Sequence, residues 1–145
     1  MPSVAVAIDF TQFILDVANS KMSMVATISG QEAEVVYVGI HDLCESVSIV
    51  WSEQRIENFR VCNGEVKPRG TVSPSWGDGS ENLVVFKSVV NNAILYGQAK
   101  QIDRSGYLVS AKSLGAVSHN CKNIEVIVSY DGDLVDRAVR EVCGK

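Results

Sequence analysis

Four cysteines and two histidines are the side chains of this 145-residue sequence best suited to metal or nucleophilic chemistry. His41 precedes Cys44 by three positions, and His119 precedes Cys121 by two. Two imidazoles and two thiolates form an acceptable zinc set, but neither spacing is a common zinc pattern and no Cys-x2-Cys occurs. A thiol hydrolase would need a cysteine beside a histidine oriented by a third group such as Asp42. Because any chain with this content offers such pairings, we expect no metal, no cofactor and no catalytic site.

The cysteines are better explained as two local disulfides. In the first, the cysteines flank a hairpin of Ser46–Trp51 with residues 57–62; in the second, a closing helix folds back over a strand at Ile124–Tyr130. Among the three possible connectivities we therefore favour Cys44–Cys62 and Cys121–Cys143. Such bridges predict an oxidising compartment, the periplasm or the extracellular space. The alternative is four small buried side chains in a cytoplasmic protein, which the sequence does not exclude.

The segment Pro68–Ser80 is the longest irregular stretch, with two prolines and three glycines. Loops held by a rigid sheet commonly carry binding groups. Trp76 is a large aromatic side chain without an obvious core role, and Arg69 and Asp78 add charge on either side of it. We therefore predict that these three residues form a recognition loop. The alternative is a solvated connector in which Trp76 folds back on the core.

Charge and hydropathy exclude several classes of function. The net charge is −4 and the isoelectric point about 5.1, which disfavours binding to nucleic acid, and no Lys/Arg cluster offsets this. No apolar run reaches the roughly 18 residues that a membrane-spanning helix needs, so no membrane insertion is expected. The amino terminus lacks a positive segment and carries Asp9, unlike a secretory signal. A protein partner is expected, and a homo-oligomer is possible.

The spacing of hydrophobic residues along the chain predicts its helices and strands. A helical stripe runs from Thr11 to Ser20, and Asn63-Gly64 between alternating segments is typical of a β-hairpin. Leu83–Tyr96 combines a helical stripe with β-branched residues, and its length favours a helix over a strand. After Asp131-Gly132-Asp133, apolar residues again recur at helical spacing and predict a closing helix. Further strands are predicted at Met22–Ile28, Glu34–Ile40, Ser46–Trp51, Ile102–Ala111 and Ile124–Tyr130.

These elements predict an α+β fold in which residues 1–145 form a single compact domain. Its mainly antiparallel sheet is expected to be covered by two or three helices, one of them at the carboxyl terminus. The function predicted from this pattern is a non-catalytic binding or assembly module, extracytoplasmic and stapled by disulfides. Two alternatives stay open: a structural subunit of a viral or bacterial assembly, and a small enzyme with a Cys/His site.

Overall fold

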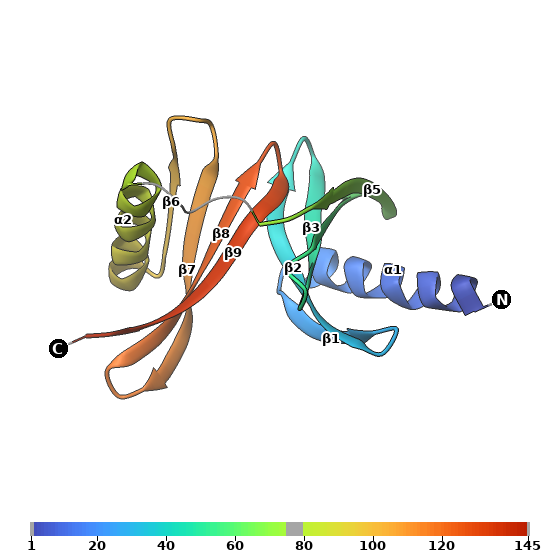
Figure 1. The fold of residues 1–145 in the computed structure, drawn as a ribbon, viewed down its shortest axis with the longest axis horizontal. Helices are drawn as coiled ribbons and strands as arrows, with labels where there is room; N and C mark the ends of the chain where they lie inside the picture. The colour runs from blue at the N-terminus through green and yellow to red at the C-terminus, as the bar shows by residue number, and fades with distance from the viewer. Residues whose placement is uncertain (1, 75–79, 145) are drawn as a thin grey trace. The chain divides into compact units, whose positions relative to one another are not determined.

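The computed structural model describes residues 2–74 and 80–144 (Figure 1). The chain forms two compact units. Unit 1 comprises residues 1–74 together with the short segment 131–134, and unit 2 comprises residues 75–130 and 135–145. No helix within the described residues is both long and apolar enough to cross a membrane. That residues 1–145 fold as a single domain stays a prediction.

Unit 1 is a five-stranded antiparallel meander with one helix packed on it. Its strands follow one another in space in their order along the chain, β1 to β5. The elements are α1 (Pro2–Ser20), β1 (Met24–Ile28), β2 (Gln31–His41), β3 (Cys44–Trp51), β4 (Ile56–Cys62) and β5 (Glu65–Val72). Pro68 lies in the edge strand β5, where the absence of a backbone N–H is tolerated.

The core of unit 1 lies between α1 and one face of this sheet. Ile14 and Val17 on the helix are buried against Val35 of β2 and Val47 and Ile49 of β3. Alternate residues of a strand point to opposite faces of the sheet, so the neighbours of these core residues lie on the other face. That face is also buried and partly polar. Its buried polar residues are Ser46, Ser48, Asn58 and Arg60.

Unit 2 has the same plan with fewer strands. Its elements are α2 (Ser80–Tyr96), β6 (Gln98–Ile102), β7 (Leu108–Ser118), β8 (Cys121–Tyr130) and β9 (Asp133–Cys143), which begins in the segment that belongs to unit 1. The strand order is β6-β7-β8-β9. Val89 and Ala93 on α2 pack against Val109, Val126 and Val128 of the sheet. The helix predicted at Leu83–Tyr96 is therefore present.

The predicted fold class is wrong in two respects. There are two antiparallel sheets with one helix each, in place of one sheet under two or three helices. The closing helix is the strand β9. Asp131 and Gly132 have positive φ angles of 52° and 83° and form a two-residue turn that returns the chain beside β8. Asp-Gly is a favoured sequence for such a turn, and the valines of β9 favour a strand.

Smaller corrections concern three element boundaries. The helix predicted from Thr11 is α1, which begins at Pro2. The irregular stretch predicted at Pro68–Ser80 is in its first part strand, since β5 extends to Val72. The single strand predicted at Ile102–Ala111 is the end of β6, a turn and the beginning of β7. In each case the local pattern did not show where one element ends and the next begins.

Both predicted disulfides are present, but the second joins two strands and not, as predicted, a strand and a helix. Cys44 begins β3 and Cys62 ends β4, so their bridge closes one end of an antiparallel pair, as expected. Cys121 begins β8 and Cys143 ends β9, so the second bridge closes the open end of a hairpin and does not pin a helix to a strand. In the described part of the chain no cysteine is free.

Candidate functional site

Four connections between neighbouring strands of the described chain are two-residue turns in which both residues have positive φ angles. Three of them carry glycine at the second position: Gly30, Gly64 and Gly132, at φ values of 78°, 78° and 83°. The fourth, between β2 and β3, carries Leu43 there, at a φ of 67°. A branched side chain is disfavoured in this left-handed region, and the cost for a non-glycine residue is about 1–2 kcal/mol. The β2–β3 turn therefore uses a residue that does not suit its backbone.

The same residue is exposed to an unusual degree. Leu43 has 99% of its surface accessible, and Ile40, three positions earlier, has 67%. Single exposed apolar residues are common on protein surfaces. An exposed leucine with a strained backbone, however, neither packs in the core nor suits the conformation of its turn. We call Ile40, His41, Asp42 and Leu43 the apex.

Covalent and polar contacts hold the apex from both sides. Cys44 follows Leu43 directly, and its disulfide to Cys62 fixes the first residue of β3. On the other side, the Nε2 of His41 lies 2.9 Å from an Oδ1 of Asp131 and 3.4 Å from an Oδ2 of Asp42. The apex therefore has little freedom to rearrange when a partner binds, which lowers the entropic cost of binding.

The segment 131–134 joins His41 to a cluster of ion pairs within unit 1. Arg60, which is largely buried, donates to the backbone carbonyl of Asp131 and lies 3.4 Å from the carboxylate of Asp133. Arg69 pairs with Asp133 at 3.2 Å and approaches Asp131 at 3.9 Å. The hydrogen bond from Arg69 to Asp133 and the charge of that carboxylate raise the pKa of the guanidinium further. The ion pairs of Arg60 and Arg69 hold the segment against β4 and β5.

Asn58 fixes the same segment through its backbone. Its amide nitrogen donates to the carbonyl of Leu134 at 3.1 Å, and its amide oxygen accepts from the N–H of Leu134 at 2.9 Å. The hydroxyl of Ser48 donates to that oxygen at 2.5 Å. A buried amide side chain thus satisfies both backbone groups of a residue that is itself fully buried.

Gly132 allows the segment to approach the apex closely. A Cβ atom built at Gly132 would lie 2.6 Å from Nη2 of Arg60 and 2.7 Å from Cγ of His41, closer than side chains tolerate. Gly64 has a similar φ, of 78° against 83°, but nothing lies within 4 Å of a Cβ built there. Substitutions at the two glycines therefore distinguish the free-energy cost of the backbone conformation from the cost of crowding by neighbouring atoms.

We expect Gly132→Ala to lower the free energy of unfolding by about 3 kcal/mol and Gly64→Ala by about 1–2 kcal/mol, since only the first adds overpacking to backbone strain. Urea denaturation followed by circular dichroism measures both. Equal losses for the two variants would show that the close approach of Gly132 to His41 and Arg60 does not contribute.

A further polar cluster lies next to the apex, because Glu45 pairs with Ile40 in the register of β2 and β3. Glu45 is 2.5 Å from Nζ of Lys21 and accepts a hydrogen bond from the hydroxyl of Tyr37. Burial raises the pKa of Glu45, but the hydrogen bonds from Lys21 and Tyr37 outweigh it, so the net pKa is lowered. Burial and the hydrogen bond to Glu45 raise the pKa of Tyr37 well above its ordinary value. These contacts tie β2 and β3 to the end of α1 and leave the apex as the exposed part of the hairpin.

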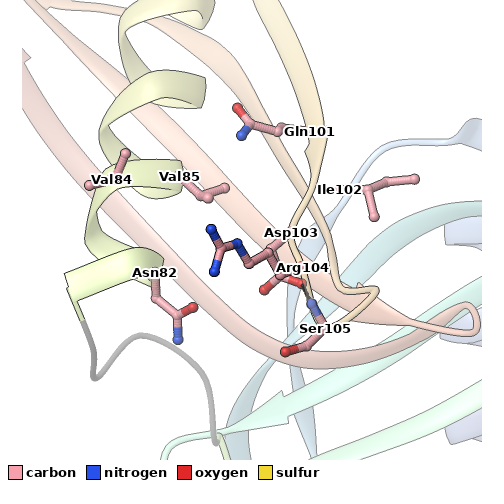
Figure 2. Close-up of a pocket in the computed structure, with 8 residues that line it drawn as sticks. All are labelled: Asn82, Val84, Val85, Gln101, Ile102, Asp103, Arg104 and Ser105. Atoms are coloured by element: carbon pink, nitrogen blue, oxygen red, sulfur yellow. Dashed lines mark hydrogen bonds between the residues drawn. The ribbon is translucent and has the colours of Figure 1, made fainter.

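Unit 2 carries a separate pocket of about 310 Å³. It lies between the first turns of α2 and the end of β6 with the turn that follows, and Figure 2 shows Val85 of α2 pointing toward Arg104 of that turn. The carboxylate of Asp103 accepts hydrogen bonds from the backbone N–H groups of Ser105 and Tyr107, both at 2.9 Å. These bonds fix the turn that forms one wall of the pocket.

The structure distributes the residues singled out in the sequence over different places. Arg69 lies in β5 and belongs to the ion-pair cluster, whereas Trp76 and Asp78 lie outside the described residues, so the predicted recognition loop stays a prediction. The histidine of the apex, His41, was noted only as a metal or catalytic candidate. Leu43 was missed, because Asp-Leu is not a turn signature and only the structure places it between two strands.

The arrangement of the cysteines bears on metal and nucleophile chemistry. Cys121, Cys143 and Glu141 place two sulfur atoms and a carboxylate within 4.8 Å of one another. Both sulfur atoms are joined in the disulfide, however, and a disulfide offers neither a metal-binding thiolate nor a nucleophile.

Comparison with known proteins adds no relative. No family model, no curated protein and no solved structure matches this chain.

Proposed function

We propose that this chain is a non-catalytic binding module that recognises a protein partner through the apex of the β2–β3 hairpin. One observation carries the proposal: Leu43 occupies a turn position that the chain elsewhere gives to glycine, and it does so with 99% of its surface exposed. Strain that is retained at an exposed position is commonly associated with function. Since the disulfide Cys44–Cys62 and the contact of His41 with Asp131 restrain the turn, the apolar side chain is presented in a fixed direction.

The charges around the apex define the chemistry of the partner. Asp42 and Asp131 flank Leu43 and His41 with side chains that are 83% and 63% exposed. A complementary surface would offer an apolar pocket for Leu43 with lysine or arginine side chains at its rim. Two disulfides support an oxidising setting, and with it a place in the periplasm or outside the cell.

The two alternative functions have less support. A Cys/His enzyme would need a thiolate, and each described cysteine lies in a disulfide. A structural subunit would use the apex to bind a second copy of the chain. The apex is flanked by carboxylates, and the chain as a whole has a net charge of −4. Like charges disfavour such self-association.

The proposal is tested by crosslinking from the apex. A photo-crosslinking amino acid at position 40, in the cell that makes the protein, is expected to yield one discrete adduct with another protein. Leu43→Asn in the same chain should abolish that adduct, and the crosslinker at position 25, which is 61% exposed on β1, should not form it. An adduct of twice the chain mass would favour the structural-subunit alternative, and adducts that persist with Leu43→Asn would overturn the proposal.

Stability measurements separate function from folding at this position. Asparagine tolerates the left-handed conformation better than leucine, so we expect Leu43→Asn to raise the free energy of unfolding by about 1 kcal/mol. A substitution that stabilises the fold while it abolishes binding identifies a residue kept for recognition. If Leu43→Asn instead destabilises the protein in a urea titration, Leu43 has a structural role that its exposure does not reveal.

A further inference from the structure

The described residues that line the pocket of unit 2 include one positive and one negative side chain. Arg104 contributes one positive charge and Asp103 one negative charge, and the other polar groups are the amides of Asn82 and Gln101 and the hydroxyl of Ser105. An arginine is only a donor and an ionised aspartate only an acceptor, whereas amides and hydroxyls are both. These described lining residues thus offer donors and acceptors together and carry no net charge among themselves, which does not favour a small ion of either sign.

The polar groups are positioned by secondary structure. Asn82 lies in the first turn of α2 and Gln101 in β6, on the two sides of the pocket, and Asp103 and Ser105 lie in the turn that ends β6 (Figure 2). Within the described chain, the amides of Asn82 and Gln101 show no intramolecular side-chain hydrogen bond, so their bonding capacity is directed to solvent or to a ligand. Asp103 is already oriented by its two bonds from the backbone.

Apolar surface accompanies these polar groups. Val84 and Val85 on α2 and Ile102 on β6 also line the pocket. Its volume of about 310 Å³ lies at the lower end of the range for ligand pockets, roughly 300–1,000 Å³, so the ligand is small or is the end of a longer molecule. A ligand that matches the lining has several hydroxyl groups that both donate and accept, a face of C–H groups, and no charge.

We propose that this pocket binds a neutral sugar unit, a single pyranose or the terminal pyranose of a glycan. The planar amides of Asn82 and Gln101 and the carboxylate of Asp103 bond to its hydroxyl groups, and Val85 packs against its C–H face. Binding is weak, because the pocket is open and offers few apolar contacts. The proposal is independent of the apex, which lies in unit 1.

Nuclear magnetic resonance of the ¹⁵N-labelled full chain tests it with defined probes. Glucose, galactose, mannose and N-acetylglucosamine are titrated separately, and sodium acetate and sodium phosphate serve as anionic comparisons. At least one sugar is expected to shift amide signals at residues 82–85 and 101–105 in a saturable way. A double variant, Asn82→Ala with Gln101→Ala, should weaken that binding about tenfold, because both amides lose their hydrogen bonds to the sugar.

Gln98→Ala is the matched control, since Gln98 is an exposed amide on the same strand β6 outside the pocket. It should leave the sugar-dependent shifts unchanged, and equal melting temperatures for all variants establish that the pocket residues are not needed for folding. Three results would overturn the proposal: saturable shifts with acetate or phosphate but with no sugar, sugar-dependent shifts that survive the double variant, and no shift with any of the four sugars.

Discussion

Replacing Asn58 with alanine is expected to lower the free energy of unfolding by about 4 kcal/mol. Asn58 is buried, and its side chain bonds to both backbone groups of Leu134 and accepts from the hydroxyl of Ser48. Alanine removes these bonds and leaves three buried polar groups unpaired, and each such group costs about 1–3 kcal/mol. Because part of this cost is relieved when the segment 131–134 shifts, the estimate lies below the sum of the separate costs.

A matched substitution makes the comparison specific. Asn91→Ala removes the same side chain from an exposed position on α2, where alanine is the better helix former, and should change the stability by less than about 0.5 kcal/mol. Guanidinium denaturation of both variants, with hydrogen exchange at the amide of Leu134, measures the effect. Rapid exchange at Leu134 should accompany Asn58→Ala. A loss below about 1 kcal/mol with unchanged exchange would mean that Asn58 does not hold the segment.

This contact illustrates why part of the fold was not predictable. Asn58 and Leu134 are separated by 76 positions, and no local pattern reports a bond between them. In sequence, the segment after Asp131-Gly132 fits a helix cap and a two-residue turn equally well. The outcome is decided by long-range contacts: Asn58 pairs with the backbone of Leu134, and Arg137 of β9 lies 2.8 Å from the buried Glu125 of β8. The spacing of hydrophobic residues along the sequence gives no sign of either contact.

Features that depend on neighbouring residues were predictable. Asn63-Gly64 forms its hairpin, with Cys62 opposite Glu65. The helical stripe at Leu83–Tyr96 prevailed over its β-branched residues, since Val89 and Ala93 face the core of unit 2. The disulfides were predictable because each joins the ends of two elements adjacent along the chain. The pairing of Cys121 with Cys143 was predicted correctly although the second element is a strand and not a helix. Either element, when it runs back along β8, returns its last residue to the beginning of β8.

The candidate site was less accessible to sequence reasoning than the fold. Charge and aromatic content pointed to residues 68–80, of which Arg69 proved to support the ion-pair cluster. The apex depends on an exposed leucine with a positive φ, and exposure and backbone angle are properties of the folded chain. A sequence without related sequences beside it does not distinguish Asp42-Leu43 from any other polar-apolar pair.

The two disulfides should contribute equally to stability and unequally to recognition. They join cysteines 18 and 22 positions apart, and loops of this length restrict the unfolded chain by a similar amount, about 3 kcal/mol each. We therefore expect Cys44→Ala with Cys62→Ala, and separately Cys121→Ala with Cys143→Ala, to lower the free energy of unfolding by about 3 kcal/mol. Denaturation in urea measures both losses. The untreated protein should have an intact mass lower by four hydrogen atoms than the reduced protein, two for each bridge.

The difference between the two double variants lies in the apex. Loss of the bridge at Cys44 frees the residue next to Leu43, so the apolar side chain is no longer held in one direction, and the adduct formed from position 40 should decrease severalfold. Loss of the bridge between Cys121 and Cys143 removes similar stability from a hairpin end that carries no part of the apex, and the adduct should persist. Equal loss of the adduct in both variants would mean that recognition follows overall stability. Loss confined to the first variant links recognition to the rigidity of one turn.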